Sequence, residues 1–188
     1  MIEINHVTDY RTRDNFEVPL WFFENVDLPK IDFSILNWSD LKTDLLQSNQ
    51  RKIADHSENT DAGIFEKLYT IRNDIIEQIK INHPIYGLVN LWPINTWKTN
   101  NSLNITIYKD SNNFYMHPHL DNRNIKSVFI MNLVDNPVST EFDIAGKIIE
   151  APTKKGSGSF YFNHSEIWHS IGPVPSDRYV FFVEEMVS

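Results

Sequence analysis

Two stretches of the sequence contain residues that can bind a metal ion. The first is residues 114–122, Phe-Tyr-Met-His-Pro-His-Leu-Asp-Asn, and the second is residues 167–179, which contain a further histidine. If the first stretch is extended, side chains two residues apart share a face, so His119 and Asp121 point the same way and can bind one ion. His169 then supplies a third ligand, and the opposite side of the metal stays open for other molecules.

The types of ligand indicate which metal and which chemistry to expect. The sequence has no cysteine, so thiolate ligands and disulfides are excluded and nitrogen and oxygen atoms must hold any metal. Two histidines and one carboxylate with open positions are typical of non-haem Fe(II) oxygenases. A lone His-x-Asp occurs often by chance. Here it is followed by a distant histidine and by Arg178 at the start of a strand, and this order makes the metal-site hypothesis specific.

Two other histidines compete for the same role. His117 shares the strand parity of His119 and Asp121, so the strand pattern alone does not decide which histidine binds the metal. Only His119 makes the His-x-Asp spacing, and we expect His117 to lie behind the ligands or to face the substrate. His164 and Glu166 form a rival His-x-Glu pair, which ranks lower because no arginine follows it at the matching distance.

Three pieces of the sequence carry a resemblance to a known family: His119-Leu120-Asp121, the distal His169, and Arg178 nine residues after it. With these residues the chain resembles the 2-oxoglutarate- and Fe(II)-dependent oxygenases, in particular their prolyl-hydroxylase-like branch. Residues 128–133 and 158–163 match strands that follow the first ligands and lead to the distal histidine. The resemblance covers roughly the second half of the chain.

The resemblance implies a fold, two cofactors and a reaction. The fold is a double-stranded β-helix, or jelly roll, with Fe(II) at its open end, held by His119, Asp121 and His169. 2-Oxoglutarate chelates the iron through its keto and C1-carboxylate oxygens, and O2 takes the last position. Decarboxylation of 2-oxoglutarate to succinate is then coupled to hydroxylation of a C–H bond in a small molecule, an amino acid or a peptide side chain. An aspartate at position 121 favours hydroxylation, because halogenating members have a small residue there.

Further residues are expected to bind the cofactor. Arg178 can hold the distal carboxylate of 2-oxoglutarate in two parallel hydrogen bonds. The alternative is a surface arginine paired with Asp177 or Glu184. Tyr108 is a second candidate for the same carboxylate, and otherwise a core aromatic residue. The cofactor-binding residues that we expect are Arg178, Tyr108, Asn132 and Ser170.

Two other classes of protein remain open at this stage. A cupin-type metalloenzyme that does not use 2-oxoglutarate would bind metal through a His117 and His119 pair. The glutamate expected a few residues beyond such a pair is missing from residues 122–125. A non-catalytic jelly-roll binding module would carry the same residues incidentally, and its metal content would distinguish it from the enzymes.

Composition limits the possible architectures and partners. A chain of 188 residues with 41% hydrophobic residues can bury one sizeable core. We therefore expect a single domain, with supporting strands and helices in residues 1–100 and the jelly-roll core and metal site in residues 101–188. The net charge of −8 argues against binding to nucleic acid. No secretion signal or membrane-spanning run is visible, so the cytoplasm is the expected location.

Hydrophobic patterns in the first half predict short strands and helices. Residues 17–23 and 31–36 are predicted strands, and Ser39 is predicted to cap a helix through Gln47. Residues 49–60 are polar and predict an exposed loop. The clearest helix begins after Asp61 and ends at residues 82–84. Its apolar stripe predicts core packing rather than a cofactor site, and in the resembled family such a helix supports the outer face of a β-sheet. The stripe consists of Ile64, Leu68, Ile71, Ile75 and Ile79.

The pattern changes to short strands after residue 84. Asn, Pro, Gly and Asp turns separate them, which favours a two-sheet barrel or jelly roll. The fold class that we expect is mainly β with N-terminal helices (α+β), a jelly roll supported by one long helix. The predicted strands are residues 85–92, 103–109, 114–121, 126–134, 139–143, 147–150, 157–163, 167–171 and 178–187.

Overall fold

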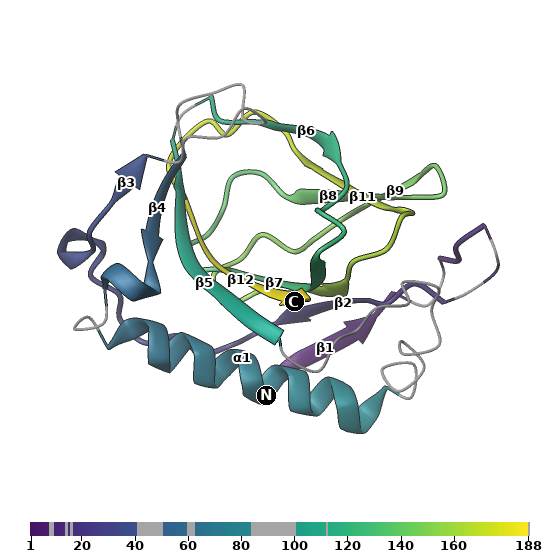
Figure 1. Cartoon of the computed structure of the whole chain (residues 1–188), viewed down its shortest axis with the longest axis horizontal. Coiled ribbons are helices and arrows are strands. Elements are labelled where there is room, and N and C mark those ends of the chain that lie inside the picture. Colours follow the sequence, from purple (N-terminus) through teal and green to yellow (C-terminus); the bar gives the residue numbers. More distant parts are fainter. Residues whose placement is uncertain are drawn as a thin grey trace.

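The computed structural model of the chain describes residues 1–7, 10–13, 15, 17–40, 51–59, 63–83, 101–111 and 113–187. These residues form two antiparallel β-sheets and one long α-helix (Figure 1). The large sheet has the strand order β1 (Glu3–His6), β2 (Leu20–Glu24), β10 (Gly158–Phe162), β7 (Ile125–Asn132), β12 (Arg178–Val187), β5 (Asn101–Asp110), β4 (Arg51–Asp55) and β3 (Ser39–Asp40). The small sheet has the order β6 (Met116–His119), β11 (Ile167–Ile171), β8 (Thr140–Ile144) and β9 (Lys147–Glu150).

The large sheet carries apolar side chains on both faces, and each face packs against a different layer. Successive side chains of β12 point to opposite faces. Val180 packs between the two sheets, whereas Phe181 and Val183 pack on the outer face. The space between the sheets is therefore one apolar layer, and the outer face of the large sheet is a second.

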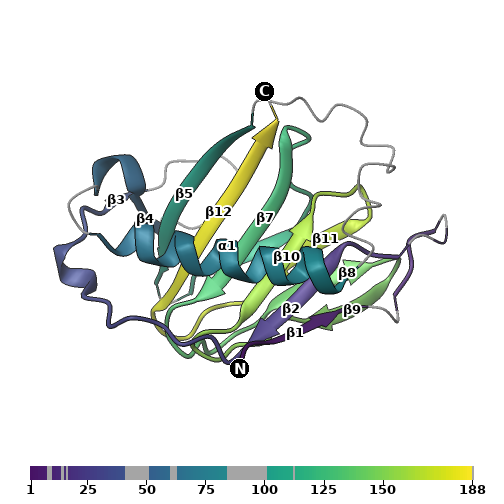
Figure 2. The ribbon, with the colours of Figure 1, turned by 90° about the horizontal axis from the view of Figure 1, so that it is seen from below.

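Helix α1 (Ile64–Asn82) covers this outer face and crosses the strands of the large sheet (Figure 2). Its predicted apolar stripe is confirmed as core, except that Ile71 is only partly buried. Each fully buried aliphatic side chain contributes roughly 1.5–3 kcal/mol to this packing. The helix has Gly63 as its N-cap, in a left-handed conformation with φ of 60°, so it begins slightly later than Asp61 predicted.

Residues 31–36 and 49–60 differ from the predictions. Residues 31–36 are not a strand: Phe33–Ile35 form a 3₁₀ helix, because the Asp32 side chain accepts hydrogen bonds from the Ser34 amide and hydroxyl and closes a turn. Residues 49–60 are not simply a loop, because residues 51–55 form β4, which pairs with β5, and a 3₁₀ helix, His56–Glu58, follows. Strand β4 was not predicted because its sequence is polar. Its Arg51 can be buried because it pairs with the carboxylate of Asp110.

The prediction of several N-terminal helices is also wrong for the part of the chain that is described. There, one α-helix and two single-turn 3₁₀ helices are present. Ser39 and Asp40 form strand β3 instead of starting a helix, and residues 41–50 of that predicted helix lie outside the described residues. The strand predicted at residues 85–92 also lies outside them.

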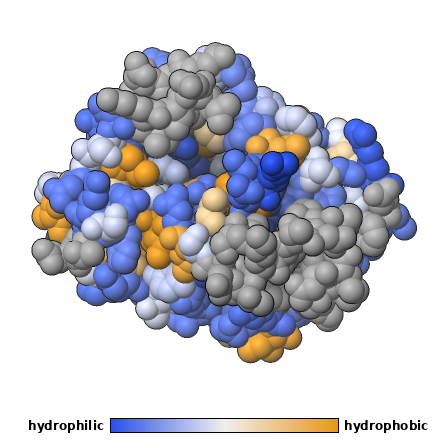
Figure 3. Space-filling model, in the orientation of Figure 1, coloured by the Kyte–Doolittle hydropathy of each residue, from blue (hydrophilic) through white to orange (hydrophobic). Residues whose placement is uncertain are grey.

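The predicted strands of the second half are confirmed. Strands β9, β11 and β12 have the predicted bounds, and the others agree within a few residues. No helix among the described residues is both long and apolar enough to cross a membrane. Hydrophilic residues cover much of the described part of the face shown in Figure 3, consistent with the net charge of −8.

Candidate metal and anion site

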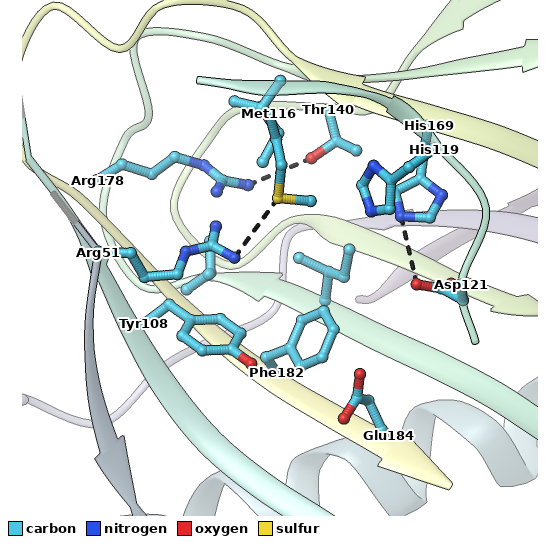
Figure 4. Close-up of a pocket in the computed structure, with 13 residues that line it drawn as sticks. Arg51, Tyr108, Met116, His119, Asp121, Thr140, His169, Arg178, Phe182 and Glu184 are labelled. Atoms are coloured by element: carbon cyan, nitrogen blue, oxygen red, sulfur yellow. Dashed lines mark hydrogen bonds and ion pairs between the residues drawn. The ribbon is translucent and has the colours of Figure 1, made fainter. Parts of the chain in front are cut away.

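The small sheet brings the three predicted metal ligands together. His119 ends β6 and lies opposite His169 of β11 in the strand pairing. Asp121 follows two residues after His119, and its Oδ1 lies 3.5 Å from His169 Nε2. One ligand atom from each of the three residues lies within 4.8 Å of the others, and Figure 4 shows the side chains converging. We call these three residues the metal group. Their two nitrogens and one oxygen suit a borderline divalent ion such as Fe(II).

Hydrogen bonds orient two members of the metal group. His119 Nδ1 lies 2.9 Å from the main-chain oxygen of His117. A carbonyl only accepts, so Nδ1 carries the proton and Nε2 is left for a metal. Asp121 Oδ2 accepts a hydrogen bond of 2.7 Å from the phenol of buried Tyr161. The other carboxylate oxygen, Oδ1, stays directed towards the histidines.

Burial sets the protonation of the groups around the metal site. Desolvation lowers the pKa of His169, against the opposing attraction of Asp121, and this favours the neutral imidazole that metals bind. Burial also raises the pKa of Tyr161 well above its ordinary value, and the charge of Asp121 adds to the effect. Tyr161 therefore remains a phenol that donates its proton to Asp121.

A β-bulge separates His119 from His117. His119 pairs with His169 and Met116 pairs with Ile171. The two paired residues are three positions apart in β6 but only two positions apart in β11, so β6 has one extra residue. The extra residue reverses the side-chain parity, so Met116 faces the interior and His117 is exposed, with its ring against Tyr115. The parity shared by His117 and His119 in an unbroken strand is therefore lost, and His117 lies outside the metal group.

A second charged cluster lies in the large sheet, where Arg51, Asp110 and Arg178 meet. Asp110 pairs with Arg51 of β4 and with Arg178 of β12 in the strand register. Arg51 donates two hydrogen bonds to the Asp110 carboxylate, of 2.6 and 2.9 Å, and Arg178 donates one of 2.8 Å. A second nitrogen of Arg178 donates to Thr140 Oγ1 at 3.2 Å. We call Arg51, Asp110 and Arg178 the arginine cluster.

The arginine cluster has an excess positive charge in a buried place. The Arg178 side chain is 2% exposed and that of Asp110 is fully buried. Burial raises the pKa of Asp110, but the two guanidinium groups outweigh it and hold that pKa below the ordinary value. Two guanidiniums thus share one carboxylate, and Nε of Arg178 has no hydrogen-bond partner among the described residues. Such a cluster favours an incoming anion, because buried charges require compensation.

One cavity is lined by the metal group and by the two arginines of the arginine cluster. Its internal space is about 130 Å³, and the arginines and the metal group lie on opposite sides of it in Figure 4. Ile130, Val180 and Phe182 add apolar side chains to its lining. The cavity thus offers a set of metal ligands at one end and positive charge at the other.

The structure separates the four predicted cofactor residues into two groups. Arg178 and Tyr108 line the cavity, and Arg51 stacks over the Tyr108 ring at 4.4 Å. Asn132 is instead held by Pro152 and Ser157 in a loop network. Ser170 points away because it alternates with His169, and it contacts Glu141. Asn132 and Ser170 are therefore not brought to the cavity.

Sequence reasoning did not identify Arg51, Asp110 or Tyr161 as part of the site. Arg51 stands in a polar stretch without a hydrophobic period, and Asp110 follows directly on the predicted strand 103–109. Their contact spans 59 residues of sequence, so no local pattern indicates it. Tyr161 had a weak signal as one aromatic residue in a predicted strand. Of the rival pair, His164 is buried outside the metal group and accepts a hydrogen bond from the Glu166 amide.

Comparison with known proteins shows similarity in structure only. No protein-family model matches the sequence, and no curated protein matches it in sequence. Among solved structures, a prolyl hydroxylase from Trichoplax adhaerens, in complex with a peptide of the hypoxia-inducible-factor oxygen degradation domain, is similar with a TM-score of 0.58 and 11% identity. The similarity covers 81% of this chain and 71% of that one.

Two further prolyl hydroxylases have similar structures. A prolyl-4-hydroxylase from Pseudomonas putida has a TM-score of 0.52 at 8% identity, over 80% of this chain and 78% of that one. The viral collagen prolyl hydroxylase of Paramecium Bursaria Chlorella virus-1, in a 2-oxoglutarate complex, has a TM-score of 0.52 at 11% identity, over 74% and 80%. The chain therefore has the fold of the prolyl hydroxylases.

Proposed function

We propose that the protein is an Fe(II)- and 2-oxoglutarate-dependent dioxygenase that hydroxylates a C–H bond of a small molecule, an amino acid or a peptide side chain. The observation that carries the proposal is the single cavity with the metal group at one end and the arginine cluster at the other. 2-Oxoglutarate has matching ends: a keto and carboxylate pair that chelates a metal, and a distal carboxylate. The neighbour in a 2-oxoglutarate complex supports the choice of cofactor.

The proposal gives each residue of the cavity a task. His119, Asp121 and His169 would hold the iron. Arg178 receives the distal carboxylate and already lies beside Thr140, whose hydroxyl offers another hydrogen bond. Arg51 and Asp110 hold the Arg178 guanidinium in place.

Iron with 2-oxoglutarate supplies the oxidising power: 2-oxoglutarate and O2 yield succinate and CO2, and one oxygen atom enters the substrate C–H bond as a hydroxyl. The protein positions the reactants and excludes water. The apolar side chains of Ile130, Val180 and Phe182 in the cavity lining contribute to this exclusion. Asp121 occupies the place that a halide would need, so we expect a hydroxylated or otherwise oxidised product and no chlorinated one.

We further propose that residues 101–187 form a jelly roll within a single domain of the chain. Consecutive strands from β5 to β12 pass between the large and the small sheet, with β8 and β9 together in the small one. Two facing antiparallel sheets built by such crossings are characteristic of this architecture. The metal group, on and just after the neighbouring strands β6 and β11 of the small sheet, then lies at the open end of the roll.

Anaerobic spectroscopy tests the function directly. Purified protein is given Fe(II) and 2-oxoglutarate without oxygen, and the visible charge-transfer band of the bidentate chelate is recorded. We expect the band in the wild type and in the control His117→Ala, and its absence in His169→Ala. Admission of oxygen with a true substrate should then yield succinate. Iron binding without any such band would contradict the use of 2-oxoglutarate.

A further inference from the structure

Glu184 of β12 lines the cavity but has no task in the proposed chemistry. It shares a face of the strand with Arg178 and Phe182. Glu184 lies six positions after Arg178, which is about 20 Å along a strand. Figure 4 shows Glu184 on the side of the cavity away from the arginines and towards Asp121. Its place is therefore beyond the metal group, where a substrate rather than the distal carboxylate of 2-oxoglutarate would lie.

The charge of Glu184 is not compensated within the described residues. Its Oε2 accepts a hydrogen bond of 2.9 Å from Asn104 Nδ2, and no Lys, Arg or His in the described part of the chain forms an ion pair with it. Burial raises its pKa, against the hydrogen bond from Asn104, and the charge of Asp121 adds to the increase. Two carboxylates thus face one cavity end, and of these only Asp121 belongs to the metal group.

The adjacent Glu185 shows what a compensated carboxylate looks like in the same strand. Its side chain points to the other face of the sheet, where Lys126 Nζ lies 2.9 Å from Oε1 and Ser127 donates a hydrogen bond of 2.9 Å to Oε2. Glu185 thus has a structural partner for each oxygen. Glu184, in contrast, accepts a hydrogen bond from the neutral amide of Asn104 and otherwise faces the cavity.

We propose that Glu184 recognises a positively charged nitrogen group of the substrate, so the substrate class is a basic amino acid or a peptide with a lysine or arginine side chain. This rests on the proposed function and adds the substrate's charge to it. An ammonium or guanidinium group would pair with Glu184 and place a neighbouring C–H bond towards the metal group. Glu184 is not itself a member of that group.

The test measures succinate formation in air with Fe(II) and 2-oxoglutarate in the presence of chosen probes. The cationic probes are L-lysine, L-arginine, and short peptides with one central lysine or arginine. The matched controls are Nε-acetyl-lysine, free and in the same peptide, and the corresponding glutamate peptide. We expect one or more cationic probes to stimulate succinate formation and acetylation to remove the effect. Comparison of the response to free amino acids with the response to peptides then shows whether the cationic group belongs to a free amino acid or to a peptide.

Two variants connect the response to Glu184. Glu184→Gln keeps the size of the side chain and removes its charge, so the stimulation by the best cationic probe should fall about tenfold or more at subsaturating concentration. Glu184→Asp should recover part of it. The matched control is Glu185→Gln, whose side chain faces away from the cavity, and it should respond as the wild type does. The anaerobic charge-transfer band should persist in all three variants.

The outcomes separate this inference from the proposed function. Absence of the charge-transfer band in the wild type would overturn the function itself. If the band is present but neutral or acidic probes stimulate as well as cationic ones, or no cationic probe stimulates, the assigned substrate class is wrong. Full stimulation of Glu184→Gln by a cationic probe would show that another group binds the cation, and would likewise overturn the inference.

Discussion

The three residues of the metal group are held in place by different means. The main chain at His117 orients His119, the phenol of Tyr161 orients Asp121, and burial in the small sheet restrains His169. Residues that orient ligands affect metal affinity without touching the metal. Substitutions can therefore distinguish ligands, orienting residues and neighbours.

Removal of a metal ligand is the first prediction at this scale. His119→Ala, Asp121→Ala and His169→Ala should each lose Fe(II) binding and Fe(II)-dependent turnover while keeping the fold, because none of the three side chains belongs to a hydrophobic core cluster. His117→Ala should keep its iron, since His117 is exposed beyond the bulge. Metal content and circular dichroism measure both effects. Loss of iron in His117→Ala with retention in His119→Ala would contradict the assigned ligands.

Removal of the hydroxyl that orients Asp121 is the second prediction. Tyr161→Phe keeps the ring in the core and deletes the 2.7 Å hydrogen bond to Asp121. Loss of such an orienting partner typically weakens metal binding about 10- to 100-fold. Calorimetric titration with Fe(II) under anaerobic conditions measures this. Tyr179→Phe is the control, because Tyr179 packs on the outer face of the large sheet; equal affinities of the two variants would contradict the role of Tyr161.

Removal of the anion-binding guanidinium is the third prediction. Arg178→Ala should weaken 2-oxoglutarate binding roughly 30-fold or more, because loss of one partner of a buried charge pair costs about 2–5 kcal/mol. Fe(II) affinity should change little. Arg178→Lys should recover part of the binding, since it keeps the charge without the two-pronged geometry. Titration with 2-oxoglutarate at saturating Fe(II) measures both, and wild-type affinity in Arg178→Ala would exclude this arginine as the carboxylate site.

At the scale of elements, Asp110 links three neighbouring strands of the large sheet. It stands on β5 and binds Arg51 of β4 and Arg178 of β12. Removing the carboxylate leaves two buried guanidiniums without compensation. The same contact therefore stabilises the sheet and positions the anion site.

The fourth prediction is that Asp110→Asn destabilises the protein by about 3–5 kcal/mol, as loss of one partner of a buried ion pair does. For a chain of this length the midpoint of thermal unfolding should fall by roughly 10 °C. Asp177→Asn is the control, because Asp177 pairs with Lys109 at a more exposed position and should cost less than about 1 kcal/mol. Similar midpoints for the two variants would contradict the structural role of Asp110.

The pH dependence of this effect has a definite sign. The pKa of Asp110 is lower in the folded protein than its ordinary value of 3.8. The stability that it contributes is therefore fully present above pH 3.8 and is lost as the pH falls below that value through the folded pKa. The difference in unfolding free energy between wild type and Asp110→Asn should be constant near neutral pH and shrink below pH 3.8. A difference that grows on acidification would contradict this assignment.

At the scale of the whole molecule, the cavity joins the two sheets. His119 and His169 belong to the small sheet, and Arg178 belongs to the large one. A cofactor that binds the metal and Arg178 together would connect the sheets across the apolar layer. Ligand binding should therefore stabilise the folded chain as a unit.

The fifth prediction concerns this stabilisation. A ligand at 100 times its dissociation constant adds about 2.7 kcal/mol to the stability of the folded state, so the unfolding midpoint should rise by about 5–10 °C. We expect one increment from Fe(II) and a further one from 2-oxoglutarate in anaerobic thermal unfolding. Arg178→Ala should keep the first increment and lose most of the second. Equal stabilisation of His169→Ala and the wild type by 2-oxoglutarate would contradict chelation at the metal group.

The sequence by itself determined the features that depend on local chemistry and local period. His119 and Asp121 are two residues apart, and together with the distal His169 this spacing was enough to predict the metal group. The stripe of α1 and the strands of the second half follow from hydrophobic periods within single elements. These predictions required no knowledge of which strands are neighbours.

Only the tertiary structure decided which distant charges meet. Arg51 and Asp110 are 59 residues apart and Asp110 and Arg178 are 68 apart, and a buried charge leaves no periodic signal because its partner lies on another strand. The bulge that turns His117 outward depends on the pairing of β6 with β11. The direction of Glu184 into the cavity likewise follows from how β12 lies between β5 and β7. Strand pairing sets these contacts, and pairing is a property of the folded sheets rather than of any one segment.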